Sequence, residues 1–219
     1  MKIYHYLQKQ KVYKLFAVLI ILSLASDFLV QRYIFTAKVY YNSFGEQLSM
    51  TQINAIVVNK DNSFIFVGII EIGLLFIKCL CMAAILQCGL YLRKIEISFD
   101  SILKIAVVGE FIFLIPQIIK FIWFYYSKEA YTVDDLKTFF PMSALNFFDD
   151  QKLSLLWYYP LKTINIFEVL YWFVLAFLIS PLLKKDFNSS LNIVLSSYLP
   201  ALLVWVSFIM FLVVTLNPS

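Results

Sequence analysis

The residues best suited to chemistry in this chain are four charged side chains inside long apolar segments. Glu71 and Lys78 lie in the second such segment, and Glu110 and Lys120 lie in the third. Charges at membrane depth are costly and normally face protein or water rather than lipid. Carboxyl and amino groups in such surroundings either neutralise one another or exchange protons. These side chains are therefore the first candidates for a functional site.

The depths of the four charges match if the two segments form an antiparallel hairpin. At 1.5 Å per helical residue, Glu71 lies roughly 12 Å from the start of its segment and Lys120 roughly 10 Å from the end of its own. From these same ends of the two segments, Lys78 lies roughly 22 Å and Glu110 roughly 26 Å away. We therefore predict an outer pair of Glu71 with Lys120 and an inner pair of Lys78 with Glu110. Gln117 shares the helical face of Glu110 and Lys120.

The composition places these charges in a membrane protein. The chain has 219 residues, of which 62% are hydrophobic and 15% are charged, whereas soluble domains average about 25% charged residues. A membrane span needs about 20 apolar residues. The sequence predicts an all-α, polytopic membrane helix bundle of five transmembrane helices, with residues 1–219 forming a single membrane domain. The five spans are expected at about residues 13–33, 63–91, 101–127, 162–183 and 189–216.

The basic residues predict the orientation of the bundle. They gather before the first span and in the two short connections, at Arg93 with Lys94 and at Lys184 with Lys185. Such clusters are typical of cytoplasmic segments, so we expect a cytoplasmic N-terminus and an outer C-terminus. The clustering at span ends also argues against nucleic acid as the reason for the net charge of +4. A cleaved signal peptide is the alternative for the first segment, but its apolar run is long and has no small-residue cleavage site.

Prolines and loops interrupt the spans. Pro116 and Pro200 lie inside the third and fifth spans, where a missing backbone N–H predicts a bend. The connection at residues 34–62 predicts an ordered outer loop with weak strand-like or short helical tendencies. In the connection at residues 128–162, Thr132 and Asp135 have the spacing of a capping box. Further turns are expected at residues 142–148 and 151–158, and many aromatic residues indicate short interfacial helices in this second outer loop.

The fourth span adds two polar residues to the predicted site. Asn165 and Glu168 are three residues apart and share one helical face. We expect Glu168 near the outer pair, which makes the outer pair the better place for a site and the inner pair a candidate clamp. Two interpretations are open. The charges are either interhelical clamps or the lining of a polar cavity that exchanges a proton or contacts a headgroup or peptide.

Enzymatic signatures are scarce in the sequence. The single histidine, His5, lies in the basic N-terminal segment, so no histidine-based triad or zinc site can form within the spans. Cys79, Cys81 and Cys88 all lie in the second span, and their spacing predicts packing thiols rather than a disulfide framework. No phosphate-binding loop or nucleophile elbow occurs. We predict no enzyme activity, no metal and no cofactor.

Part of the second half resembles a known family. The segment at residues 140–180, with FPMSALNFFD followed by YPLKTINIFEVLYW, resembles bacterial membrane proteins of the Yip (Ypt-interacting protein) family. The resemblance implies a non-enzymatic multi-pass protein of the bacterial inner membrane. Eukaryotic members are associated with vesicle trafficking and small GTPases, but their large cytoplasmic N-terminal region is missing here. The resemblance carries over to Pro141, Ser143, Pro160, Asn165 and Glu168.

Two functions follow as hypotheses. The first is a Yip-like membrane protein that acts through protein or lipid contacts in membrane transport or envelope assembly. Its partners would be membrane lipids and other membrane proteins or further copies of the chain, without nucleic acid. The alternative is a permease or transporter subunit with a charged intramembrane path, formed by Glu71, Lys78, Glu110, Lys120 and Glu168.

Overall fold

The computed structural model describes residues 10–127, 131–148 and 153–216, except for the side chains of residues 61 and 62. The predicted all-α fold is confirmed, because the regular structure of these residues consists of helices. Five of the described helices are long and apolar enough to cross a membrane. They are α2 (Val12–Tyr33), the Ser63–Tyr91 part of α4 (Met50–Tyr91), the interrupted helix Phe99–Tyr126, α9 (Ile166–Leu183) and α10 (Phe187–Leu216).

The contacts of the chain group it into two compact units, each with its own buried cluster. The first unit comprises Met1–Leu19, Ile77–Phe113 and Met142–Ser219. The second unit comprises Ile20–Phe76 and Leu114–Pro141. The single membrane domain expected over residues 1–219 stays a prediction.

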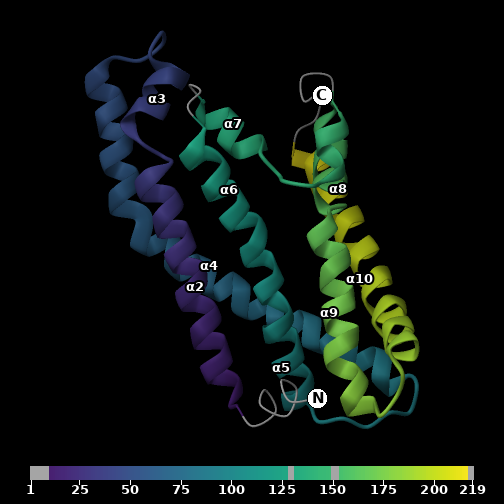
Figure 1. Cartoon of the computed structure of the whole chain (residues 1–219). Helices are drawn as coiled ribbons and strands as arrows, with labels where there is room; N and C mark the ends of the chain where they lie inside the picture. Colours follow the sequence, from purple (N-terminus) through teal and green to yellow (C-terminus); the bar gives the residue numbers. More distant parts are fainter. Residues whose placement is uncertain (1–9, 128–130, 149–152, 217–219) are drawn as a thin grey trace. The chain divides into compact units, whose positions relative to one another are not determined.

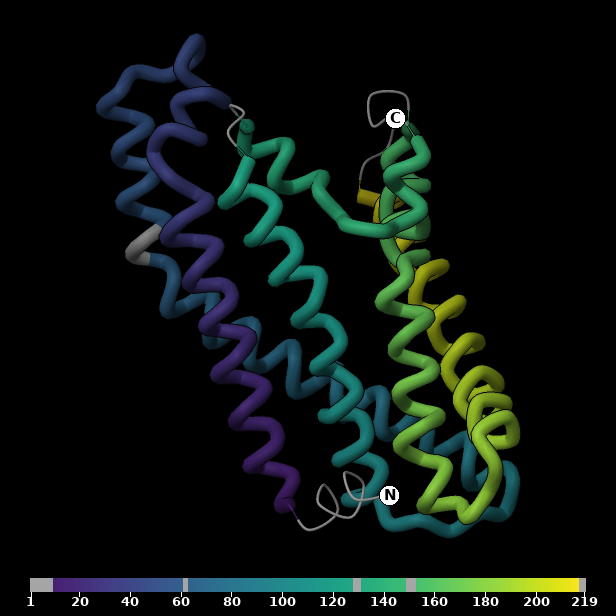
Figure 2. Tube along the Cα trace, viewed as in Figure 1, coloured from purple at the N-terminus to yellow at the C-terminus, as the bar shows by residue number. Residues whose placement is uncertain are grey.

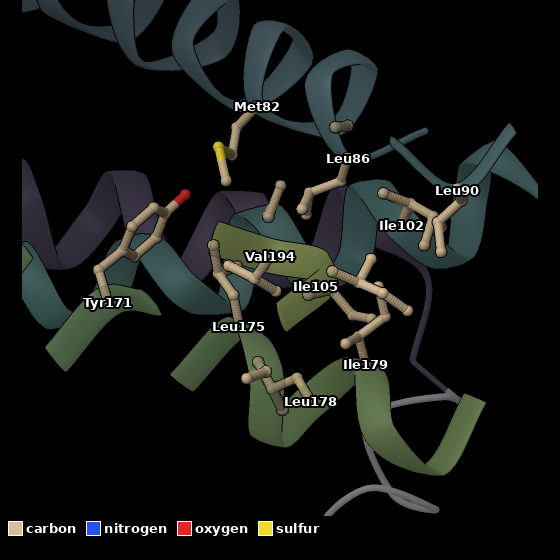
Figure 3. Packing of buried hydrophobic residues seen from close by; sticks show 14 residues of the cluster. Met82, Leu86, Leu90, Ile102, Ile105, Tyr171, Leu175, Leu178, Ile179 and Val194 are labelled. Atoms are coloured by element: carbon tan, nitrogen blue, oxygen red, sulfur yellow. The ribbon is translucent and has the colours of Figure 1, made fainter. Parts of the chain in front are cut away.

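The core of the first unit joins four helices. Met82, Leu86 and Leu90 recur every four residues along α4 and therefore lie on one face. Figure 3 shows this face packed against α5 (Phe99–Glu110), α9 and α10. The opposing side chains include Ile102, Ile105, Leu175, Ile179 and Val194, all of them nearly inaccessible. Such packing on three sides explains why this part of α4 is fixed against its neighbours.

Two short turns close the first unit at one end. Figures 1 and 2 show α9 running beside α10, and the turn between them lies at the same end as the turn from α4 to α5. Lys94 and Lys184 have positive φ angles of 58° and 52° in these turns. The Arg93 guanidinium donates a hydrogen bond to Ser196 Oγ of α10 at 2.7 Å. The two basic clusters thus share one end of the unit, and their cytoplasmic location stays a prediction.

The second unit corrects the prediction for the first outer loop. Residues 34–62, predicted as an ordered loop with weak strand-like or short helical tendencies, contain α3 (Ala37–Phe44) and the start of α4 at Met50. The physical reason is that Ile53 and Val57, one turn apart, pack against the buried cluster around Ile34 and Phe124. Helix α4 therefore has 42 residues and is about 63 Å long. This exceeds the hydrocarbon thickness of about 30 Å.

The third predicted span is interrupted. Helix α5 ends at Glu110, a 3-10 turn, η1, covers Phe111–Phe113, and α6 runs over Leu114–Tyr126. Pro116 occupies the first turn of α6, where its missing N–H costs no helical hydrogen bond. Pro200 instead lies inside α10, where its ring leaves one backbone carbonyl without its usual donor.

The second outer connection forms short helices, as expected. Helix α7 (Val133–Thr138) begins with a capping box in which Thr132 and Asp135 bond reciprocally. A second 3-10 turn, η2, covers Ala144–Phe147, and α8 covers Leu155–Thr163. From the sequence we expect Asp149 or Asp150 to cap the turn that follows them, but both residues lie outside the described part of the chain.

Gly89 gives a direct test of the packing between α4 and α10. A Cβ atom added to Gly89 would lie 1.7 Å from Ser197 Oγ and 2.6 Å from Ser197 Cβ. We expect Gly89→Ala to destabilise the protein by about 1–3 kcal/mol through overpacking, measured as a lower thermal unfolding midpoint in detergent. Gly73→Ala is the matched control, because a Cβ there meets no atom within 4 Å. Equal midpoints for the two variants would contradict the close approach of the helices.

Candidate functional site

The predicted inner pair, Lys78 with Glu110, forms a close ion pair in the first unit. Lys78 Nζ lies 2.6 Å from Glu110 Oε2. The Glu110 side chain is only 2% exposed, whereas that of Lys78 is 49% exposed. Lys78 Nζ also lies 3.8 Å from the ring centroid of Phe113, which adds a cation–π contact. Glu110 is therefore the buried member of the pair and depends on Lys78 for neutralisation.

A second buried acid lies in the same unit. Glu168 is 8% exposed, and the Tyr198 hydroxyl donates a hydrogen bond to Glu168 Oε1. The charges of Lys78 and Glu110 are close enough to act on Glu168. The sequence predicts Glu168 near Glu71 and Lys120. The structure instead places it with the inner pair.

Tyr171 joins these groups from α9. Its side chain is nearly inaccessible, and its ring lies 5.1 Å from that of Phe113, centroid to centroid. The Tyr171 hydroxyl approaches the Glu110 carboxyl group. Neither this hydroxyl nor Glu110 Oε1 has a hydrogen-bond partner of regular geometry among the described atoms. These two groups are therefore not joined by a regular hydrogen bond. We use "charged network" for Lys78, Glu110, Glu168, Tyr171 and Tyr198.

Asn165 has a different place from the one predicted. It is the N-cap of α9, and its Oδ1 accepts a hydrogen bond from the Glu168 N–H at 2.8 Å. Its Nδ2 donates to the carbonyl oxygens of Lys162 and Thr163. The fourth span therefore begins at Ile166 rather than at Lys162. The sequence signal was present, because Asn followed three residues later by Glu is a capping pattern.

The segment before α9 is held by its neighbours. Ser143 and Asn165 form an isolated antiparallel bridge, and the Trp205 indole N–H donates to the Tyr159 hydroxyl at 2.7 Å. Burial lowers the pKa of Lys162, which lies in α8 outside the spans. The resemblance positions Ser143 and Asn165 thus meet in space, although neither belongs to the charged network.

The predicted outer pair does not form. Glu71 Oε1 accepts a hydrogen bond from Ser23 Oγ at 3.0 Å, and Lys120 Nζ donates to the Leu136 carbonyl oxygen. Among the described residues, the ion pairs are Lys78–Glu110, Lys104–Asp100 and Lys137–Asp134. The correction has a physical reason. Leu136 lies in the last turn of α7, where carbonyl groups lack helical partners and attract a cation.

Oxygen-bearing side chains of α2, rather than a lysine, interact with Glu71. Asp27 lies within hydrogen-bonding reach of Glu71. Ser26 Oγ donates to Gln117 Oε1 at 2.7 Å, and its rotatable hydroxyl is equally close to the Ser23 carbonyl oxygen at 2.8 Å. We call Ser23, Ser26, Asp27, Glu71 and Gln117 the oxygen cluster; all five belong to the second unit.

The residues from α2 were not part of the predicted site, although serines at this spacing can bond across to a neighbouring helix. Ser23, Ser26 and Asp27 are spaced three and four residues apart, which places them on one helical face. That spacing could have identified them. Matching opposite charges along the sequence does not identify hydroxyl groups as partners. Among the described residues, no group of three or more His, Cys, Asp or Glu side chains could hold a metal ion.

These features define a multi-pass α-helical membrane protein with two polar clusters on its helices. No family model, no curated protein and no solved structure matches the chain. The resemblance to the Yip family therefore stays a prediction.

Tyr198→Phe tests the charged network. The change removes the hydrogen-bond donor of the buried Glu168 carboxyl group, and an unsatisfied buried polar group costs about 1–3 kcal/mol. We expect a lower thermal unfolding midpoint in detergent. Tyr91→Phe is the control, because Tyr91 is 79% exposed. If both variants unfold at the wild-type temperature, the bond to Glu168 contributes nothing to the fold.

Proposed function

We propose that this chain is a non-enzymatic, multi-pass protein of a bacterial inner membrane, which acts through contacts with other membrane proteins or with lipids. The resemblance to the Yip family supports this proposal and suggests a role in membrane transport or envelope assembly. The N-terminus is proposed to be cytoplasmic and the C-terminus to lie outside. In this protein the charged network acts as a clamp between helices.

The observation that carries the proposal is the pairing of Glu110 within its own unit. The carboxylate lies 2.6 Å from Lys78 Nζ and is almost completely inaccessible. A charged side chain that binds a substrate during transport would have to be accessible to that substrate. A charge that is neutralised by its neighbour is costly to separate, because one partner would remain buried and unpaired. The geometry therefore favours a structural role.

The outward faces of the spans support the proposed contacts. Large apolar side chains of α10, among them Trp205, Phe208 and Phe211, are about half exposed or more. In a membrane, such a surface packs against lipid tails or against another helix. The proposed partners are membrane lipids and other membrane proteins or further copies of this chain.

A permease or transporter subunit is the second candidate, and the oxygen cluster favours it. Asp27 and Glu71 lie within hydrogen-bonding reach of each other. Two carboxyl groups in such contact need a proton or a cation between them, since two negative charges repel. This candidate places an ion-handling site at Asp27 and Glu71, and not along the predicted series of five charges.

Separate and joint neutralisation of the inner pair tests the clamp. Lys78→Met leaves the Glu110 carboxylate buried without its partner, so we expect a strong loss of stability, up to about 3–5 kcal/mol. Glu110→Gln should cost less, because the Lys78 side chain is half exposed and can reach a more polar environment. The double variant should recover most of the stability lost in Lys78→Met. The measurement is folded yield and thermal unfolding midpoint in detergent.

The control is Asp134→Asn, which breaks an exposed ion pair with Lys137 in the second unit and should cost at most about 1 kcal/mol. Wild-type stability for all the inner-pair variants, combined with loss of a proton-linked uptake in vesicles, would refute the clamp and favour the permease. Glu71→Gln in the same uptake assay tests the second candidate directly.

A further inference from the structure

A cavity of about 470 Å³ lies in the second unit, where α2 ends and α3 begins. Its apolar lining includes Phe28 of α2 and Phe35 of the connection between α2 and α3. Val57 and Phe64 of α4 complete this lining. Val57 and Phe64 are seven residues apart and share a helical face. The rings of Phe28 and Phe64 meet edge to face at 6.1 Å between centroids, so the two helices form one continuous apolar wall.

Arg32 gives the cavity a positive charge. It lines the cavity together with Gln31 and lies in the last turn of α2. Its side chain is exposed and makes no ion pair or hydrogen bond with any described residue. An arginine at this end of a helix can bond the terminal carbonyl groups, but Arg32 makes no such bond. Its planar guanidinium group is therefore available to an anion, and its geometry suits a phosphate.

The start of α3 adds to this preference for an anion. Thr36 and Ala37 line the same cavity. Thr36 is the N-cap of α3, and its side chain makes no capping hydrogen bond. The N-terminus of a helix carries a partial positive charge and unpaired N–H groups, which favour phosphate groups. Lys60 Nζ, 4.1 Å from the ring centroid of Phe35, places a further positive charge beside the cavity wall.

The depth of Arg32 matches the headgroup region of a membrane. Helix α2 has 22 residues and a length of about 33 Å, close to the hydrocarbon thickness of about 30 Å. Arg32, one residue from its end, would therefore lie at the level of lipid headgroups. Phe28 lies about one turn deeper, toward the acyl chains.

From this arrangement we propose that the cavity binds an anionic phospholipid. Arg32 and the N-terminus of α3 hold the phosphate group, and an acyl chain lies along Phe28, Val57 and Phe64. Charge complementarity selects the ligand, because positive groups stand at the headgroup level and apolar side chains lie below them. This inference goes beyond the function proposed above and does not depend on it, since a contact protein and a permease can both hold such a lipid.

Native mass spectrometry of the full chain in detergent tests the proposal. The probes are phosphatidylglycerol, which is anionic, and phosphatidylcholine, which is zwitterionic. We expect tighter binding of phosphatidylglycerol. Arg32→Gln should weaken it about tenfold or more, through the loss of a charge-assisted hydrogen bond. Lys38→Gln is the matched control, because Lys38 is an exposed cation on α3 outside the cavity lining.

A second variant tests the acyl-chain part of the site. Val57→Trp fills the cavity without changing any charge, and it should also weaken binding of phosphatidylglycerol. Wild-type affinity in Arg32→Gln, or equal binding of the two lipids, would overturn the proposal. So would unchanged binding in Val57→Trp, or displacement of the lipid by glycerol phosphate at the same concentration, which would identify a free phosphate compound as the ligand.

Discussion

The carboxylate of Glu110 must remain next to Lys78, and the rest of the first unit depends on this constraint. An unpaired charge in an apolar interior costs several kcal/mol, so α4 and α5 cannot separate or slide without a large penalty. The ion pair stands at the end of α5, immediately before the turn Phe111–Phe113. In the part of α4 that follows Lys78, Met82, Leu86 and Leu90 pack against α5, α9 and α10. The pair fixes the register in which this apolar packing takes place.

Hydroxyl groups rather than opposite charges bond the buried Glu168 and the half-buried Glu71. Tyr198 donates to Glu168, and Ser23 donates to Glu71. A hydroxyl group provides a hydrogen bond without the desolvation cost of a second ion. Each unit therefore supplies partners for its own acids: Lys78 and Tyr198 bond Glu110 and Glu168 in the first, and Ser23 bonds Glu71 in the second. The first unit thus holds an ion pair, and the second holds the oxygen cluster.

The spans and the inner pair could be predicted from the sequence, because length, apolar content and the cost of a buried charge are local properties. The depths of Lys78 and Glu110 follow from the helical rise per residue alone. The outer pair failed because the partner of Lys120 is the backbone carbonyl of Leu136, which no charge pattern reveals. The extension of α4 back to Met50 also escaped prediction, since it depends on tertiary packing of Ile53 and Val57. The spacing of Asn165 and Glu168 indicates a helix cap, but the prediction made Asn165 part of the charged site instead.

The contact between Lys78 and Glu110 in a lipid bilayer is the most direct test of this account. Solid-state NMR can measure the dipolar coupling between ¹⁵N at Lys78 Nζ and ¹³C at Glu110 Cδ, and the ¹³C shift reports whether the carboxyl group is ionised. The account predicts a strong coupling, as expected for a nitrogen that lies 2.6 Å from Oε2, and an ionised carboxylate. Absence of the coupling, or a protonated Glu110 beside a distant Lys78, would contradict it.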